Sequence, residues 1–198
     1  MTFEEIEATD RIILGIDPGS SVMGYGVLCI RAKNAHYITA GIIDLRKISN
    51  HYLTLQKIFT EVTKLIEQYY PNELAIEAPF FGKNVQSMLK LGRSQGAAIT
   101  AATCRDIPVV EYAPLKIKQA ITGNGQASKE QVANMLCKIL KIDKNQLPKE
   151  LDATDGLAAA YCHFLESTRP TTESKHYVNW KDFANKNASR ISKTPGKK

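Results

Sequence analysis

The alternation of apolar and polar residues predicts that the chain opens with three β-strands. An apolar, β-branched run over residues 11–17 leads into a Pro-Gly turn at 18–21, and a second apolar run covers 24–30. A third run follows at 37–45, after a polar turn at 33–35. Because such short links cannot carry a parallel crossover, we expect these strands to form an antiparallel meander.

Helical spacing dominates the chain after residue 50. Apolar residues recur every three or four positions from Tyr52 to Tyr69, which predicts a helix that ends before Pro71. The other predicted elements are strands at 74–77 and 107–111 and helices at 83–104, 114–121, 128–140 (opened by a Ser-x-x-Gln capping box) and 152–165. This order predicts an α/β fold with a mixed five-stranded sheet, three antiparallel strands followed by two with helical crossovers, flanked by helices.

Charge is distributed unevenly along the 198 residues, whose formal net charge is +6. Residues 1–166 hold 18 basic and 18 acidic residues, so the net charge lies in residues 167–198, where large apolar residues are few. We expect an acidic N-terminal extension at 1–10, a folded domain at 11–166 and a basic, flexible C-terminal extension at 167–198. Within the domain, residues 83–149 hold 11 basic and four acidic residues, which fits either phosphate contacts or solvated helix faces.

Cysteine usage and hydropathy favour a reducing compartment. The cysteines include no close C-x-x-C pair, so neither a zinc site nor a disulfide framework is predicted, and buried free thiols are expected. No apolar run reaches the ~20 residues that span a bilayer, and the first ten residues lack the features of a signal peptide. We therefore expect a cytoplasmic protein with no membrane partner.

Carboxylates stand at the ends of two predicted strands and at the start of the last predicted helix. Asp17 closes the first strand, and Glu77 closes the strand at 74–77, where an unpaired buried carboxylate would cost several kcal/mol. Asp152 and Asp155 lie three residues apart, so both side chains can point at one site. Structural roles are open alternatives: an Asx turn for Asp17, and helix capping for the two aspartates of the helix.

Taken together, these four carboxylates favour a divalent metal centre. Clustered carboxylates repel one another unless a cation neutralises them, and Mg²⁺ and Mn²⁺ prefer oxygen ligands. Two such ions ~3.5–4 Å apart can activate a water and stabilise the leaving oxygen of a phosphodiester. The pattern therefore predicts a metal-dependent nuclease that uses Mg²⁺, with Mn²⁺ as a substitute and two ions in each active site.

Five segments within residues 11–166 form an ordered set of motifs. They are the strand and Gly-rich turn at 13–26, Ala-Ile-Glu at 75–77, Lys-Leu-Gly-Arg-Ser-Gln-Gly at 90–96, Tyr-Ala-Pro-Leu-Lys-Ile-Lys-Gln at 112–119 and Asp-Ala-Thr-Asp-Gly-Leu-Ala at 152–158. Together they resemble the RuvC family of bacterial Holliday-junction resolvases. Each motif alone is weak, but five in the same order are specific.

This resemblance implies a ribonuclease H-like fold and a defined activity. The family's four catalytic, metal-binding carboxylates fall on Asp17, Glu77, Asp152 and Asp155. Family members act as homodimers that bind a four-way DNA junction and make paired nicks in two strands of like polarity, at a short thymine-containing site. Their partners are the RuvA and RuvB branch-migration proteins.

The resemblance also implies DNA-binding residues. Phe80 matches an aromatic residue that stacks on a base near the junction centre, which is worth ~1–3 kcal/mol per base; Phe81, beside it, either assists or fills the core. Lys118 and Lys129 match basic residues near the scissile phosphate. Lys83 is expected to contact DNA because it lies close to the two phenylalanines.

Two segments depart from the shorter family members, and one helix is a candidate for the dimer contact. Residues 144–151 form a longer approach to the last helix, and residues 167–198 have no counterpart in the family; we expect this tail to add sequence-independent DNA affinity. The 83–104 helix carries Gly92 and Gly96, which permit either a dimer contact or close packing on the protein's own sheet.

Three other functions fit parts of the pattern. Sugar kinases and actin-like ATPases also use a Gly-x-Asp-x-Gly turn, but residues 11–166 are too few for the second lobe that holds adenosine. An RNA-processing nuclease of the same fold differs in preferring structured RNA. A junction-binding module without chemistry is disfavoured because all four carboxylate positions are occupied.

Overall fold

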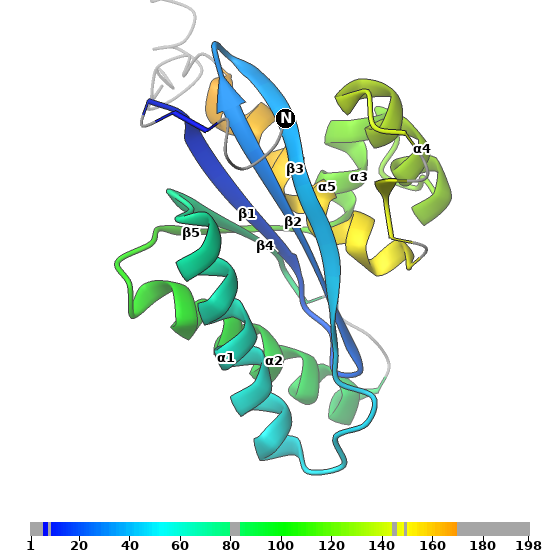
Figure 1. Cartoon of the computed structure of the whole chain (residues 1–198). Helices are drawn as coiled ribbons and strands as arrows, with labels where there is room; N and C mark the ends of the chain where they lie inside the picture. Colours follow the sequence, from blue (N-terminus) through cyan, green and yellow to red (C-terminus); the bar gives the residue numbers. More distant parts are fainter. Residues whose placement is uncertain (1–5, 8, 80–83, 144–145, 149, 170–198) are drawn as a thin grey trace, which may run out of the picture. The chain divides into compact units, whose positions relative to one another are not determined.

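The structure is a computed structural model that describes residues 6–169 apart from 8, 80–83, 144, 145 and 149 (Figure 1). In chain order its elements are β1 (Arg11–Asp17), β2 (Val22–Arg31), β3 (Asn34–Asp44), α1 (His51–Tyr69), β4 (Glu73–Glu77), α2 (Val85–Thr103), β5 (Val109–Tyr112), α3 (Pro114–Thr122), α4 (Lys129–Leu140) and α5 (Leu151–Thr168). The strands form one sheet in the order β3-β2-β1-β4-β5. The pairs β1–β2 and β2–β3 are antiparallel, whereas β1–β4 and β4–β5 are parallel, so the predicted mixed sheet is confirmed.

Several strand boundaries differ from those predicted by one to three residues, and two of them have a clear local cause. The third strand begins at Asn34 rather than at residue 37, because Ala32 and Lys33 both take positive φ (49° and 66°) and turn the chain within two residues. The fifth strand begins at Val109 rather than at residue 107. Pro108 has no N–H to donate, and its carbonyl accepts from Leu74 at the edge of the ladder.

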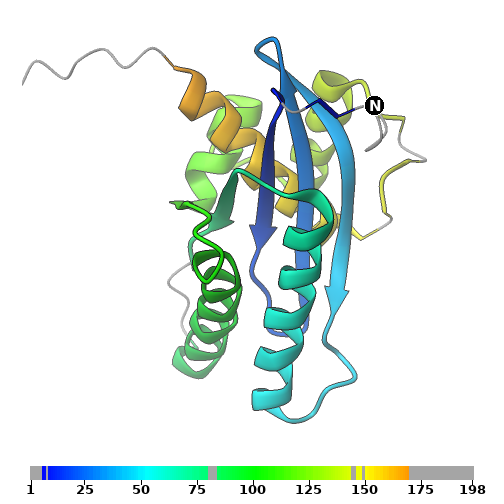
Figure 2. The same cartoon turned by 60° about the vertical axis from the view of Figure 1, so that its left-hand side comes forward.

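Helices cover both faces of the sheet, and successive β1 side chains mark the two sides. Ile12 and Leu14 belong to the core under α1 and α2, whereas Ile13 belongs to the core under α3, α4 and α5. Figure 1 and Figure 2 show these layers, with α1 and α2 running side by side on one face and α5 crossing the other. Because both faces are covered, β1 is apolar at consecutive positions.

Glycines let α5 lie directly on the sheet. A Cβ on Gly24 of β2 would lie 1.7 Å from the carbonyl oxygen of Asp152 at the start of α5. From the helix side, a Cβ on Gly156 would lie 2.5 Å from the Cα of Tyr25. Backbone therefore packs against backbone, and these glycines set how closely α5 approaches β2.

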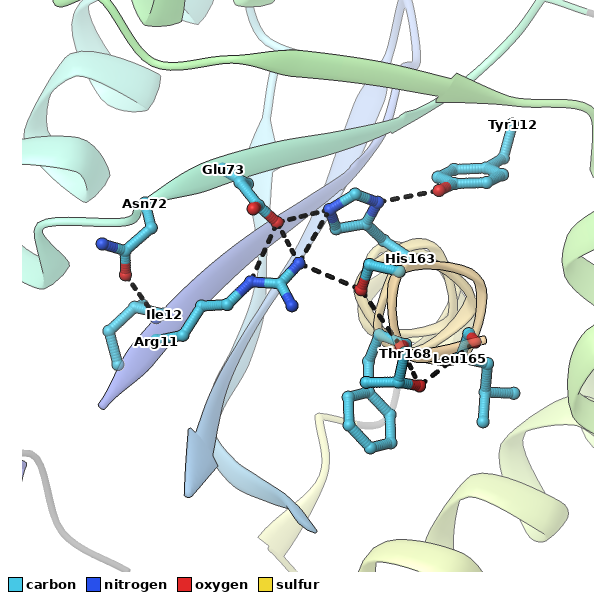
Figure 3. Close-up of polar contacts among 10 residues, drawn as sticks. Arg11, Ile12, Asn72, Glu73, Tyr112, His163, Leu165 and Thr168 are labelled. Atoms are coloured by element: carbon cyan, nitrogen blue, oxygen red, sulfur yellow. Dashed lines mark hydrogen bonds and ion pairs between the residues drawn. The ribbon is translucent and has the colours of Figure 1, made fainter. Parts of the chain in front are cut away.

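A polar network joins α5 to the first residues of β1 and β4 and to Tyr112, the last residue of β5 (Figure 3). Arg11, which begins β1, forms an ion pair with Glu73, which begins β4. The Nε2 atom of His163, on α5, lies 2.5 Å from the same Glu73 carboxylate, and its Nδ1 atom lies 2.7 Å from the Tyr112 hydroxyl. His163 is only 5% exposed, so this polar side chain crosses the apolar layer with partners on both ring nitrogens.

The cysteines agree with the sequence analysis in all but the exposure of one of them. All four cysteines are free, as predicted; Cys29, Cys137 and Cys162 are buried, but Cys104 is exposed because it follows the last turn of α2 at the surface. Among the described residues, no helix combines the length and apolar character needed to cross a membrane.

Candidate active site

Two of the predicted carboxylates lie at one edge of the sheet. Asp17 and Glu77 are the last residues of β1 and β4. The two strands are parallel and Ile16 pairs with Ile76, so the next residues, Asp17 and Glu77, lie side by side at the same edge. Because parallel strands end together, residues 60 positions apart in the sequence become neighbours.

The start of α5 brings the other two carboxylates to this edge. One oxygen atom from each of Asp17, Asp152 and Asp155 lies within 4.8 Å of the others. The contact between Gly24 and the Asp152 backbone sets this approach, since Gly24 is the residue that pairs with Asp17 across β1 and β2. The three-residue spacing then turns Asp155 to the same side of the helix as Asp152.

Burial and mutual repulsion make the ionised cluster costly. Burial raises the pKa of Glu77 to about 7, and the negative charge of Asp155 adds to the rise. Burial also raises the pKa of Asp17 well above its usual range, reinforced by the charges of Glu77 and Asp155. A cation bound at the cluster would relieve both effects.

Two lysines bring positive charge to the cluster. Ser128 caps α4 through the predicted capping box, which makes Lys129 the first residue of that helix. The Nζ atom of Lys129 lies 2.5 Å from Asp155 Oδ2 and 3.2 Å from Asp152 Oδ1. Burial raises the pKa of Asp155, and the charges of Lys129 and of Lys118 on α3 oppose that rise.

The donor set fits a hard divalent cation. Every donor atom of the Asp17, Asp152 and Asp155 cluster is a carboxylate oxygen, the ligand type that Mg²⁺ and Mn²⁺ prefer. Glu77 adds a fourth carboxylate whose charge interacts with Asp17 and Asp155. The structure thus brings Asp17, Asp152 and Asp155 within 4.8 Å of one another and places Glu77 at the end of the neighbouring strand, although these residues come from two strands and a helix.

Gln95 is a residue of the site that the sequence analysis did not single out. Its side chain is 8% exposed, and its Nε2 atom donates to the Glu77 carbonyl oxygen at 3.4 Å and to the Glu111 carboxylate at 3.0 Å. These hydrogen bonds attach α2 to the end of β4 next to Glu77. The signal available in the sequence was a glutamine next to the small residues Gly96, Ala97 and Ala98, at a position where an amide needs partners if it is buried.

The predicted DNA-binding residues are only partly placed. Lys129 pairs with Asp152 and Asp155, and the charge of Lys118 acts on Glu77 and Asp155, whereas Phe80, Phe81 and Lys83 lie outside the described residues. In α2 the small residues divide between two faces: Ala98 is fully buried in the core that α1, α2 and the sheet share, but a Cβ on Gly92 or Gly96 would meet nothing within 4 Å of the described residues. Packing on the protein's own sheet therefore explains only the alanines.

Comparison with known proteins places this arrangement in a family. The family model for the crossover junction endodeoxyribonuclease RuvC matches residues 13–163, a span that includes all four carboxylates. The chain belongs to the RuvC family. RuvC of Bacteroides fragilis is 64% identical over 182 residues, which cover 92% of this chain and 96% of that protein. RuvC of Porphyromonas gingivalis is 55% identical over 184 residues, which cover 92% and 97%.

Solved structures of RuvC show the same fold. The Thermus thermophilus RuvC structure matches with a TM-score of 0.71 and 29% identity, covering 79% of this chain and 95% of that one. The structure of T. thermophilus RuvC in complex with a Holliday junction substrate matches with a TM-score of 0.69 and 27% identity, covering 79% and 94%. The predicted family and its ribonuclease H-like fold are confirmed.

Proposed function

We propose that this protein is a structure-selective endonuclease that resolves four-way (Holliday) DNA junctions by paired, symmetric, metal-dependent nicks during recombination and DNA repair. The observation that carries the proposal is the convergence of Asp17, Asp152 and Asp155, with oxygen atoms within 4.8 Å, at one edge of a ribonuclease H-like sheet. Relatives named crossover junction endodeoxyribonuclease, and a relative's structure that contains a Holliday junction substrate, support it.

The four carboxylates are assigned to the metal. Mg²⁺, or Mn²⁺ in its place, is the proposed cofactor, with two ions in each active site. When bound, such ions stabilise the attacking and leaving oxygens of a phosphodiester. Asp17, whose charge interacts with all three other carboxylates, would help to hold both ions. Glu77 and Asp152 would each help to hold one of them, and Asp155 would complete a site or orient a water molecule there.

Basic and aromatic side chains are assigned to the DNA. Lys129 pairs with Asp155, and the charge of Lys118 acts on the same carboxylate; positive charges there would stabilise the negative charge that builds on the scissile phosphate. Phe80 is proposed to stack on a base near the junction centre, with Phe81 and Lys83 in support. RuvA and RuvB are the proposed protein partners, by the family resemblance.

A homodimer is proposed because two symmetric nicks need two sites. An apolar face of α2 supports this: Val85 and Leu89 are 65% and 51% exposed, and Gly92 and Gly96 continue the same helix face, where an added Cβ would meet nothing within 4 Å in the part of the chain that the structure describes. Residues at these spacings line one side of a helix, so two copies can approach closely there.

Cleavage of a synthetic four-way junction in MgCl₂ tests the proposed function. We expect the wild type to nick two strands of like polarity and to leave linear duplex and structured RNA largely uncut. Asp17→Asn should lose at least about 100-fold in rate, since it removes a charge at the centre of the site. Glu67→Gln is the matched acid-to-amide control, because Glu67 pairs with Arg105 on the surface. An inactive wild type, or an Asp17→Asn variant that cuts as well as the control, would refute the proposal.

A further inference from the structure

The ammonium group of Lys129 pairs with two of the carboxylates that the proposed function assigns to a metal ion. Its Nζ atom lies 2.5 Å from Asp155 Oδ2 and 3.2 Å from Asp152 Oδ1, so it bridges two of the assigned ligands. The Asp155 side chain is only 13% exposed, and its ionised form needs a nearby positive charge. In the metal-free protein, Lys129 supplies that charge.

The surroundings of Lys129 allow its side chain to leave without disturbing the fold. The backbone at this position is held by the capping box between Ser128 and Gln131, while the Lys129 side chain is 48% exposed. Four rotatable bonds connect this anchored backbone to the ammonium group. The side chain can therefore swing toward solvent while α4 stays in place.

We propose that Lys129 is an internal counter-ion of the metal-free site, which holds Asp152 and Asp155 together until a divalent cation displaces its ammonium group. This inference rests on the proposed metal centre and adds that Lys129 competes with the metal ion for Asp152 and Asp155. A doubly charged ion neutralises the carboxylates more completely than an ammonium group does, so metal binding breaks both ion pairs. The displaced side chain stays at the rim of the site, where a phosphate oxygen of the DNA can accept from it.

Metal titration of the DNA-free protein tests the competition without measuring cleavage. Lys129→Met keeps the length of the side chain and removes the competing charge. We expect it to bind Mg²⁺ about five-fold more tightly, as a partly exposed ion pair no longer has to be broken. Its melting temperature without metal should fall, and the rise caused by saturating MgCl₂ should exceed the wild-type rise by about 2–4 °C.

Two control variants separate this role from others. Lys129→Arg keeps the charge and should respond to Mg²⁺ as the wild type does. Lys138→Met removes a lysine from the last turn of the same helix and should also leave the Mg²⁺ affinity unchanged, which separates the local effect from a general change in net charge.

The possible outcomes distinguish the two proposals. If Lys129 only supported the fold, Lys129→Met would lower the melting temperature equally with and without metal, and the counter-ion role would be overturned. An Mg²⁺ affinity equal to or below the wild-type value would overturn it as well. A wild type that shows no response to Mg²⁺ or Mn²⁺ would instead refute the metal centre of the proposed function, and the competition with it.

Discussion

The added methyl group of Gly24→Ala is predicted to move Asp152 and Asp155, on α5, away from Asp17 and Glu77, at the strand ends. The Cβ of an alanine would lie 1.7 Å from the carbonyl oxygen of Asp152 and 2.6 Å from its carbonyl carbon. Because a Cβ essentially never approaches another heavy atom closer than 3.0 Å, either β2 or the start of α5 must move by about 1.3 Å or more. Overpacking of this kind costs about 1–3 kcal/mol in stability. A misplacement of ~1 Å in a catalytic group can reduce the rate by ~100-fold.

Thermal unfolding and junction cleavage measured on the same preparations test this prediction. We expect Gly24→Ala to lower the melting temperature by about 2–10 °C and the cleavage rate by about 100-fold. The control for unfolding is Asn134→Ala at an exposed position of α4, away from the active site and from the proposed dimer contact; because alanine favours a helix more than asparagine does, this variant should be stabilised by up to about 0.7 kcal/mol. Wild-type stability together with wild-type cleavage in Gly24→Ala would show that the spacing between α5 and β2 does not position Asp152.

Three further predictions concern other parts of the molecule. Burial raises the pKa of Glu73, but hydrogen bonds from Arg11 and His163 outweigh it and leave the pKa below 4.5; this stabilisation is present above pH 4.5 and lost on acidification. Glu73→Gln should therefore lower the melting temperature at pH 7 by several degrees and by less as the pH falls below 4.5, whereas a pH-independent difference would contradict the assignment. Removal of residues 170–198 should flatten the salt dependence of junction binding, and an unchanged slope would reject the proposed role of the tail. Leu89→Glu should shift the protein from dimer to monomer in light scattering while Ile139→Glu, also at the surface, does not; equal masses for both variants would contradict the α2 interface.

The elements of the fold could be predicted because their signals are local. Apolar spacing, the Pro-Gly turn after Asp17 and the capping box at Ser128 each act within a few residues, and the structure has strands and helices where they indicate. The errors lie at boundaries such as Ala32 and Lys33, where two residues adopt positive φ without the glycine that usually signals such a turn.

The sequence by itself determined the family, through five motifs in order, and it predicted the four carboxylates, because strand ends and the start of a helix are recognisable from neighbouring residues. Only the tertiary structure decided how they meet. The distance between α5 and β2 depends on Gly24. The ion pair of Lys129 with Asp155 depends on the packing of α4 against α5, and His163 contacts Glu73, which lies 90 residues away in the sequence. Contacts of this kind depend on how separate elements pack, and the packing involves the whole core, so no local pattern encodes them.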